Sequence, residues 1–90
     1  MDYDMKLTAF ILVQNQVGNS NRIITELQRL AGIRSAHFVT GLYDVIAVAE
    51  VPDVTDLNPL INRIHGIPGI GKTATCLAID NPAVMDTSVL

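Results

Sequence analysis

The sequence predicts one α+β domain with the element order βαββαβ, and three observations carry this prediction. Its 90 residues suffice for a single domain. Four apolar segments with strand character alternate with two segments whose apolar residues recur at helical spacing. The second half of the chain repeats the first at an offset of 37 residues, so that Ile23 corresponds to Leu60.

The first strand is predicted at Lys6–Gln14, where Leu, Ile, Val and Phe predominate and apolar residues fall on both faces. The following segment, Asn15–Asn21, contains Asn19 and Ser20, either of which is suited to cap a helix. We expect Gly32 to end that helix. Its apolar face consists of Ile23, Ile24, Leu27, Leu30 and Ala31.

The second strand is predicted at Ile33–Thr40 and has mixed polarity. Gly41-Leu42 forms a tight turn into the third strand, Tyr43–Val51, which ends at Pro52.

The second helix is expected to start near Asp56, after the cap residues of Asp53–Asp56. Pro59 then falls in the first turn, where its missing N–H removes no helical hydrogen bond. Gly66–Gly69 ends this helix, and Ile70–Ile79 is the last strand. The apolar face consists of Leu57, Leu60, Ile61 and Ile64.

The repeat turns this element order into a fold. Two βαβ units in tandem form the ferredoxin-like fold, a four-stranded antiparallel sheet with two helices on one face. We expect a single domain with a core of residues 6–80 and a tail of residues 81–90. The offset maps the first helix's Ile23, Ile24, Leu27 and Leu30 onto Leu60, Ile61, Ile64 and Ile67, Gly32-Ile33 onto Gly69-Ile70, and Ala9 and Ile11 onto Ile46 and Val48.

Composition predicts self-association. Of the residues, 49% are apolar, and the mean hydropathy is +0.35. A domain this small has little interior, so surplus apolar surface tends to lie in an interface. Because the helices cover only one face of the sheet, we expect a homodimer packed sheet to sheet, a dimeric α/β barrel, with the sheets roughly 10 Å apart.

Charge and cysteine content exclude several functions. The formal charge is −3 with six scattered Lys and Arg residues, so no basic face for nucleic acid is evident. Cys76 is the only cysteine, which excludes an internal disulfide and a multi-cysteine metal site. The acidic start, Met1–Asp4, lacks a signal-peptide pattern, and the longest apolar run, Ala9–Val13, is too short to span a membrane. We therefore expect a cytoplasmic protein that contacts no membrane.

Gly66–Thr73 matches the phosphate-loop pattern G-x-x-x-x-G-K-[ST]. That loop requires a strand before it and a helix after it, whereas here a helix precedes and a strand follows. We interpret the match as a helix end. His37 and His65 have no metal ligands at suitable spacing, and Cys76 has no basic neighbour, so we predict no catalysis, metal or cofactor.

Asp44 stands at the head of an otherwise apolar strand, and two interpretations are open. Its carboxylate can stabilise the turn by accepting backbone N–H bonds. It can equally serve as the partner of a ligand's ammonium group, beside glycine backbone that allows close approach.

The motifs G-I-x-x-A-H (Gly32–His37), G-x-Y-D-V-I-A (Gly41–Ala47) and I-P-G-I-x-x-T-x-T (Ile67–Thr75) occur in that order. From Lys6 to Asp80 the chain resembles the effector-binding domain of the leucine-responsive/asparagine regulator (Lrp/AsnC) family, also called the RAM domain. The resemblance implies dimers joined into octameric or similar rings, with an amino-acid effector bound between dimers. It implies that this cleft is lined by Gly41, Leu42, Tyr43 and Asp44, and completed by Thr73 and Thr75.

In this interpretation Asp44 binds the ammonium group, and backbone N–H groups near Gly41 and Tyr43 bind the carboxylate. Full-length family members carry a helix-turn-helix domain, but here only five residues precede the first strand. The chain thus resembles a stand-alone form without direct DNA binding, whose effect on transcription would be indirect, through full-length Lrp/AsnC regulators.

Two alternatives remain. Small dimeric α/β-barrel monooxygenases and isomerases share this architecture, and a polar pocket between sheet and helices with His37 or Tyr43 would favour such an enzyme. RNA-recognition domains share the strand order, but they need a basic surface with exposed aromatic residues. Four aromatic residues in an acidic chain disfavour that function.

Overall fold

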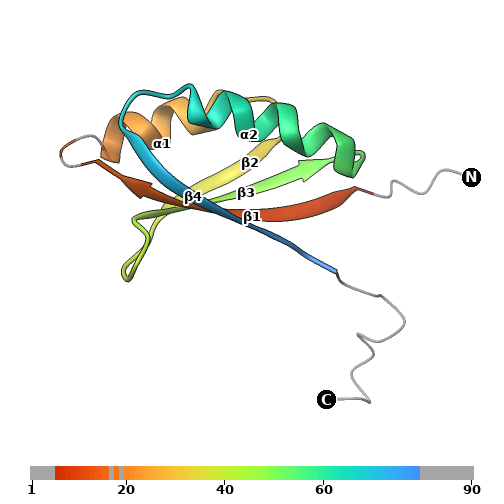
Figure 1. The fold of residues 1–90 in the computed structure, drawn as a ribbon, viewed down its shortest axis with the longest axis horizontal. Coiled ribbons are helices and arrows are strands. Elements are labelled where there is room, and N and C mark those ends of the chain that lie inside the picture. The colour runs from red at the N-terminus through yellow and green to blue at the C-terminus, as the bar shows by residue number, and fades with distance from the viewer. Residues whose placement is uncertain (1–5, 17, 19, 80–90) are drawn as a thin grey trace, which may run out of the picture.

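The computed structural model describes residues 6–16, 18 and 20–79. Within them, strands and helices follow the predicted βαββαβ order (Figure 1). A short 3-10 turn, η1 (Val54–Asp56), leads directly into the second helix. The elements are β1 (Leu7–Asn15), α1 (Ser20–Gln28), β2 (Ile33–Phe38), β3 (Val45–Val51), α2 (Leu57–His65) and β4 (Ile70–Leu77).

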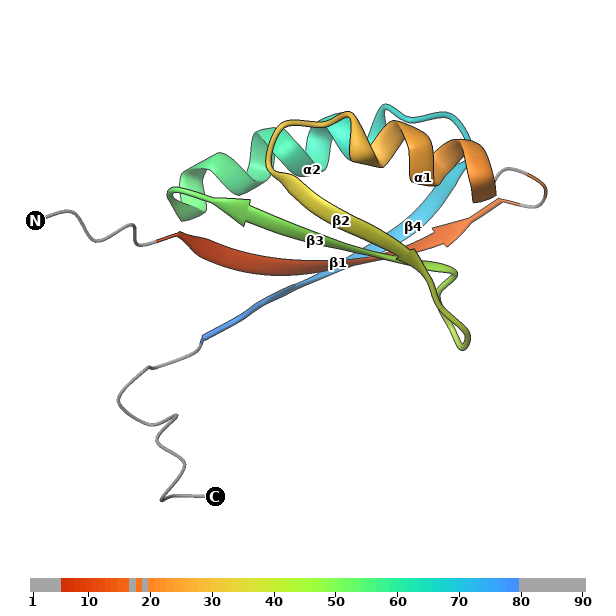
Figure 2. The same ribbon diagram turned by 180° about the vertical axis from the view of Figure 1, so that it is seen from behind.

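The strands form one antiparallel sheet in the order β2-β3-β1-β4, and both helices lie on the same side of it (Figures 1 and 2). The ferredoxin-like α+β fold is therefore confirmed. Register fixes which residues share a face: Ile11 of β1 lies opposite Ala47 of β3 and Thr75 of β4. Residues in such a row point to the same side of the sheet.

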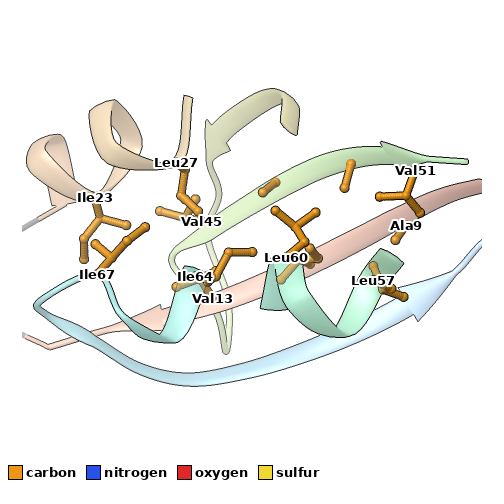
Figure 3. Close-up of a cluster of buried hydrophobic side chains, with 13 residues drawn as sticks. Ala9, Val13, Ile23, Leu27, Val45, Val51, Leu57, Leu60, Ile64 and Ile67 are labelled. Carbon is orange, nitrogen blue, oxygen red and sulfur yellow. The ribbon is translucent and has the colours of Figure 1, made fainter. Parts of the chain in front are cut away.

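The hydrophobic core fills the space between the sheet and the helices (Figure 3). Alternate residues of β1 and β3 face the helices, and burying each large aliphatic side chain contributes roughly 1.5–3 kcal/mol. No polar side chain is buried among the described residues. The core consists of Ala9, Ile11, Val13, Ile23, Leu27, Val45, Ala47, Ala49, Val51, Leu57, Leu60, Ile64 and Ile67.

The ends of α2 follow the sequence prediction. Asp53 accepts hydrogen bonds from the Val54 N–H at 2.9 Å and from the Thr55 hydroxyl at 2.8 Å, and so begins η1. Pro59 lies in the first turn of α2, and Gly66 follows its last residue. At the other helix the predicted cap Asn19, the Ser20 side chain and the tail 81–90 lie outside the described residues. None of the described helices is long and apolar enough to cross a membrane.

The internal repeat holds for the helices and turns but is wrong for the strands. Ile23 and Leu60 are both fully buried, and Gly32 and Gly69 have similar φ values of 98° and 96°. Ile11, however, faces the helices, whereas its predicted equivalent Val48 lies on the opposite face, since Ile11 pairs with Ala47. The same holds for Ala9 and Ile46. The correspondence is off by one residue, which exchanges the two faces of a strand.

Strand ends are also shorter than predicted. β3 begins at Val45 instead of Tyr43, β2 ends at Phe38, and β4 ends at Leu77. Between β2 and β3 the chain leaves the sheet. A backbone hydrogen bond from the Val39 N–H to the Asp44 carbonyl, at 2.9 Å, joins the two ends of this segment. Residues 39–44 are therefore a loop, named the 39–44 loop below.

Candidate functional site

The 39–44 loop contains the first four predicted site residues. In both ribbon views it extends away from the helix layer (Figures 1 and 2). Gly41 has a φ of 122°, a conformation that favours glycine, and nothing lies within 4 Å of where its Cβ would be. Leu42 at the tip is 85% exposed.

Asp44 ties the loop to the end of β1. Its backbone N–H donates to the Val13 carbonyl at 2.9 Å, and its Oδ2 accepts from the Asn15 N–H at 2.8 Å. The turn-stabilising interpretation of this carboxylate is therefore observed. Only one of its two oxygens is used in this way, and among the described residues Oδ1 has no hydrogen-bond donor. Oδ1 is available for a second partner.

A small cavity of about 120 Å³ lies beside the loop, lined by Gln14, Leu42, Tyr43 and Lys72. Gln14 and Lys72 are register partners on β1 and β4, and the Gln14 side-chain amide lies 3.4 Å from the Leu42 carbonyl oxygen. Metabolite pockets usually measure roughly 300–1,000 Å³, so this cavity needs a further wall to enclose an amino acid.

Gln14 and Lys72 were not predicted as site residues. Lys72 stood out only through the phosphate-loop match, which the structure rejects, since α2 precedes Gly66–Thr73 and β4 follows from Ile70. The signal that identifies both residues is the β1–β4 register. Register depends on contacts between strands far apart in sequence, which a single sequence does not reveal.

Thr73 and Thr75 lie on the other face of β4 from Lys72. They pair with Val13 and Ile11, which face the helices. The Thr73 hydroxyl and His65 Nε2, at the end of α2, are 3.0 Å apart. One protomer thus brings the 39–44 loop together with Gln14 and Lys72, but not with the two threonines. A cleft with all six predicted residues requires a second copy or a ligand that reaches around the edge strand.

Charged and polar groups from three segments lie near the 39–44 loop. These three segments meet at this end of the sheet. They contribute a carboxylate oxygen of Asp44, the ammonium of Lys72 and the amide of Gln14. Such groups form charge-assisted hydrogen bonds with ammonium and carboxylate partners.

Of the side chains considered for catalysis, Tyr43 lines the small cavity, whereas His37 and Cys76 are not among its lining residues. His37 pairs with Ile46 and Cys76 with Phe10, so both lie on the face without helices. The space between sheet and helices, where the enzyme alternative requires a polar pocket, is filled with aliphatic side chains. Over the described part of the chain, no three His, Cys, Asp or Glu residues are grouped to hold a metal ion.

Comparison with curated proteins finds regulators and part of an enzyme. HTH-type transcriptional regulator FL11 of Pyrococcus horikoshii is 27% identical over 73 residues, which cover 81% of this chain and 48% of the regulator. The chain thus spans about half the length of that relative. Homocitrate synthase of Sulfolobus acidocaldarius is 31% identical over 65 residues, or 68% of this chain but only 14% of the enzyme.

Among solved structures, the crystal structure of TTHA0845 from Thermus thermophilus superposes with a TM-score of 0.80 at 26% identity. The match covers 83% of this chain and 95% of that one. The family model described as the Lrp/AsnC ligand binding domain matches residues 8–87. The fold, the loop and this match lead to one conclusion: the chain belongs to the Lrp/AsnC ligand-binding domain family.

Proposed function

We infer that this effector-binding module binds a free amino acid at the 39–44 loop, in a cleft that a neighbouring copy completes. The observation that carries the inference is the geometry of Asp44. One carboxylate oxygen holds the loop by accepting from the Asn15 N–H, and the other is left without a donor among the described residues. Its loop neighbours Leu42 and Tyr43 line a cavity together with Lys72.

Each part of an amino acid has a partner at this end of the sheet. The ammonium group binds Asp44 Oδ1, and the carboxylate binds backbone N–H groups near Gly41 and Tyr43. Lys72 adds a positive charge for the same carboxylate. Thr73 and Thr75, which face away from the loop of their own protomer, supply hydroxyls to the cleft of a neighbour.

The open face of the sheet supports assembly. It carries an apolar patch that no described element of the same chain covers, and Phe10 in this patch is 37% exposed. In the proposed homodimer a second copy packs its own open face against this patch, and dimers join into an octamer or similar ring. The patch consists of Phe10, Leu12, Ile46, Val48, Ala74 and Cys76.

Ligand binding and assembly are linked in this proposal. A ligand between two copies favours the assembly in which both walls of its cleft are present. Relatives such as FL11 are regulators in which this domain spans half the chain. In this proposal the domain acts on transcription indirectly, by assembling with full-length Lrp/AsnC regulators through the shared sheet face.

The test separates the two roles of Asp44. The twenty amino acids are titrated by calorimetry into the wild type and into Asp44→Asn, Asp44→Ala and a control, Glu26→Gln on α1. Asp44→Asn keeps an acceptor for the Asn15 N–H but loses the charge, so we expect a near-native melting temperature and at least about tenfold weaker binding. Asp44→Ala loses both functions and about 1–2 kcal/mol of stability.

Glu26→Gln leaves binding unchanged. Absence of binding by every amino acid at millimolar concentration contradicts the proposal. So does an Asp44→Asn variant that binds like the wild type.

A further inference from the structure

A second, larger cavity lies at the other end of the sheet from the 39–44 loop. Its volume is about 450 Å³. This cavity lies at the start of β1, because its lining includes Lys6 and Val51, and Val51 pairs with Leu7, the first residue of β1. The 39–44 loop instead contacts the end of β1, at Val13. The cavity is named the α2 groove, because one face of α2 forms a wall. It is lined by Lys6, Ala31, Gly32, Glu50, Val51, Pro52, Asp56, Pro59, Leu60 and Arg63.

Asp56, the last residue of η1, and Arg63 in α2 place opposite charges at the two ends of this wall. Asp56, Pro59, Leu60 and Arg63 are spaced i, i+3, i+4 and i+7, which places them on one face of a helix. Seven residues of helix separate the two charged positions by roughly 10 Å along the axis. Among the described residues, neither the Asp56 carboxylate nor the Arg63 guanidinium has an ion pair or a hydrogen bond.

The floor between the two charges is apolar. Its accessible apolar surface comes from the exposed residues Ala31, Pro52 and Pro59, whereas Leu60 is fully buried and Val51 is 4% exposed. Gly32 lies beside this floor, where a Cβ would be in ordinary van der Waals contact, 3.4 Å from a methyl group of Leu60. Its φ of 98° also disfavours any other residue. An apolar cavity of this size with a few charged groups is typical of small-molecule sites.

We propose that the α2 groove binds an elongated molecule with a carboxylate at one end, an amine at the other and an aliphatic chain between them. The planar guanidinium of Arg63 binds the carboxylate through two parallel hydrogen bonds. Asp56 binds the ammonium, and the aliphatic chain lies along Pro59, between the two charged residues. Of the other charged wall residues, Glu50 is already paired with Arg34 at 3.0 Å and Lys6 also has an interaction partner, so Asp56 and Arg63 carry the proposed binding.

Residues 1–5 are the competing occupant. Asp2 and Asp4 precede Lys6 closely in the sequence, and their carboxylates are chemically suited to Arg63. This alternative fills the same cavity with part of the chain itself and leaves no site for a free ligand. The experiment below therefore includes a chain in which both acidic residues are neutralised.

The experiment is a chemical-shift titration of the deuterated, ¹⁵N-labelled full chain. The probes are glycine, 4-aminobutanoate, 6-aminohexanoate and 8-aminooctanoate, with hexanoate and hexylamine as controls that lack one charged end. We expect saturable shifts with 6-aminohexanoate at the amides of Ala31, Gly32 and Val51. Glycine and the two single-charge controls bind at least about tenfold more weakly, because each leaves one charged group unpaired.

Variants assign the site. Arg63→Gln and Asp56→Asn each weaken 6-aminohexanoate binding about tenfold or more, and Arg22→Gln, which removes an exposed arginine of α1, leaves it unchanged. The proposal is overturned by absence of saturation at millimolar concentration, by equal weakening in Arg22→Gln, or by shifts confined to the 39–44 loop. It is also overturned if only the Asp2→Asn/Asp4→Asn chain binds, since residues 1–5 then occupy the groove.

Discussion

The two faces of the sheet are built from the same strands and the same kinds of residue, yet they differ in what covers them. On β3, Ala47 and Ala49 face the helices and are fully buried, while Ile46 and Val48 face the other way and stay half-exposed. Helices lie on one side only (Figure 2). Apolar character therefore does not decide burial in this chain. The presence of a second layer decides it.

The largest effect is expected on the helix-facing side. Ile11 is fully buried in the core, so Ile11→Ala removes packed methylene groups and leaves a cavity. We expect the free energy of unfolding to fall by about 2–5 kcal/mol. Urea denaturation monitored by circular dichroism measures it. Because the cover comes from the same chain, the loss is independent of protein concentration, and a loss below about 1 kcal/mol contradicts the core assignment.

On the open face of the sheet, we expect a substitution to change the association of two copies instead of the stability of one. Ile46→Lys places a charge in the middle of the patch, and we expect the dimer dissociation constant to rise about a hundredfold or more, or roughly 3 kcal/mol. The protomer keeps its circular dichroism spectrum, since no core residue changes. Sedimentation velocity measures the association, with Thr25→Lys on the exposed side of α1 as control. An unchanged sedimentation coefficient for Ile46→Lys is the adverse result.

The sequence was sufficient for the element order because strand and helix periodicities are local. The α2 start is an example: Asp53, Asp56 and Pro59 each act within one turn of the chain. Which face of the sheet each strand residue occupies does not depend on local sequence alone. The offset of 37 residues aligns Ile23 with Leu60 correctly, but it also aligns Ile11 with Val48, which faces the other side of the sheet. The cause is that the strand-to-helix connections differ in length between the two halves.

The candidate site was predictable only where one segment carries it. The 39–44 loop is contiguous, and its residues stood out together. Gln14 and Lys72 join it through the β1–β4 register, and the α2 groove forms where α2 meets the turn after α1 and the end of β3. Both arrangements depend on tertiary packing. Asp44 shows the same limit, since its bond to the Asn15 N–H spans 29 positions of sequence.

A smaller effect is expected at the border between the two faces. Thr73 lies on the helix-facing side of the edge strand β4, where its hydroxyl is 3.0 Å from His65 Nε2. Thr73→Val keeps the shape and removes that hydrogen bond, so we expect a loss of about 0.5–1 kcal/mol. Thermal unfolding measures it, with Thr75→Val as the matched control on the same face. Equal losses in the two variants would mean that the His65 contact is not the cause.

The smallest effect is expected at the rim of the open face. Arg34 pairs with Glu50 at 3.0 Å, but 63% of the arginine side chain is exposed. Solvent screening limits such a pair, so Arg34→Gln should cost at most about 0.5 kcal/mol, and less at high salt. Urea denaturation at low and high salt concentration checks this. A larger, salt-independent loss would show that this rim has a structural role beyond the ion pair.

The reactivity of Cys76 tests the central claim most directly, because this thiol is exposed in the single chain and lies opposite Phe10 on the open face. The measurement is the rate of thiol modification by a disulfide reagent as the protein concentration increases. If a second copy covers the open face, the wild type reacts ever more slowly with increasing concentration, while Ile46→Lys reacts rapidly throughout. A wild-type rate that matches Ile46→Lys at every concentration would contradict the account.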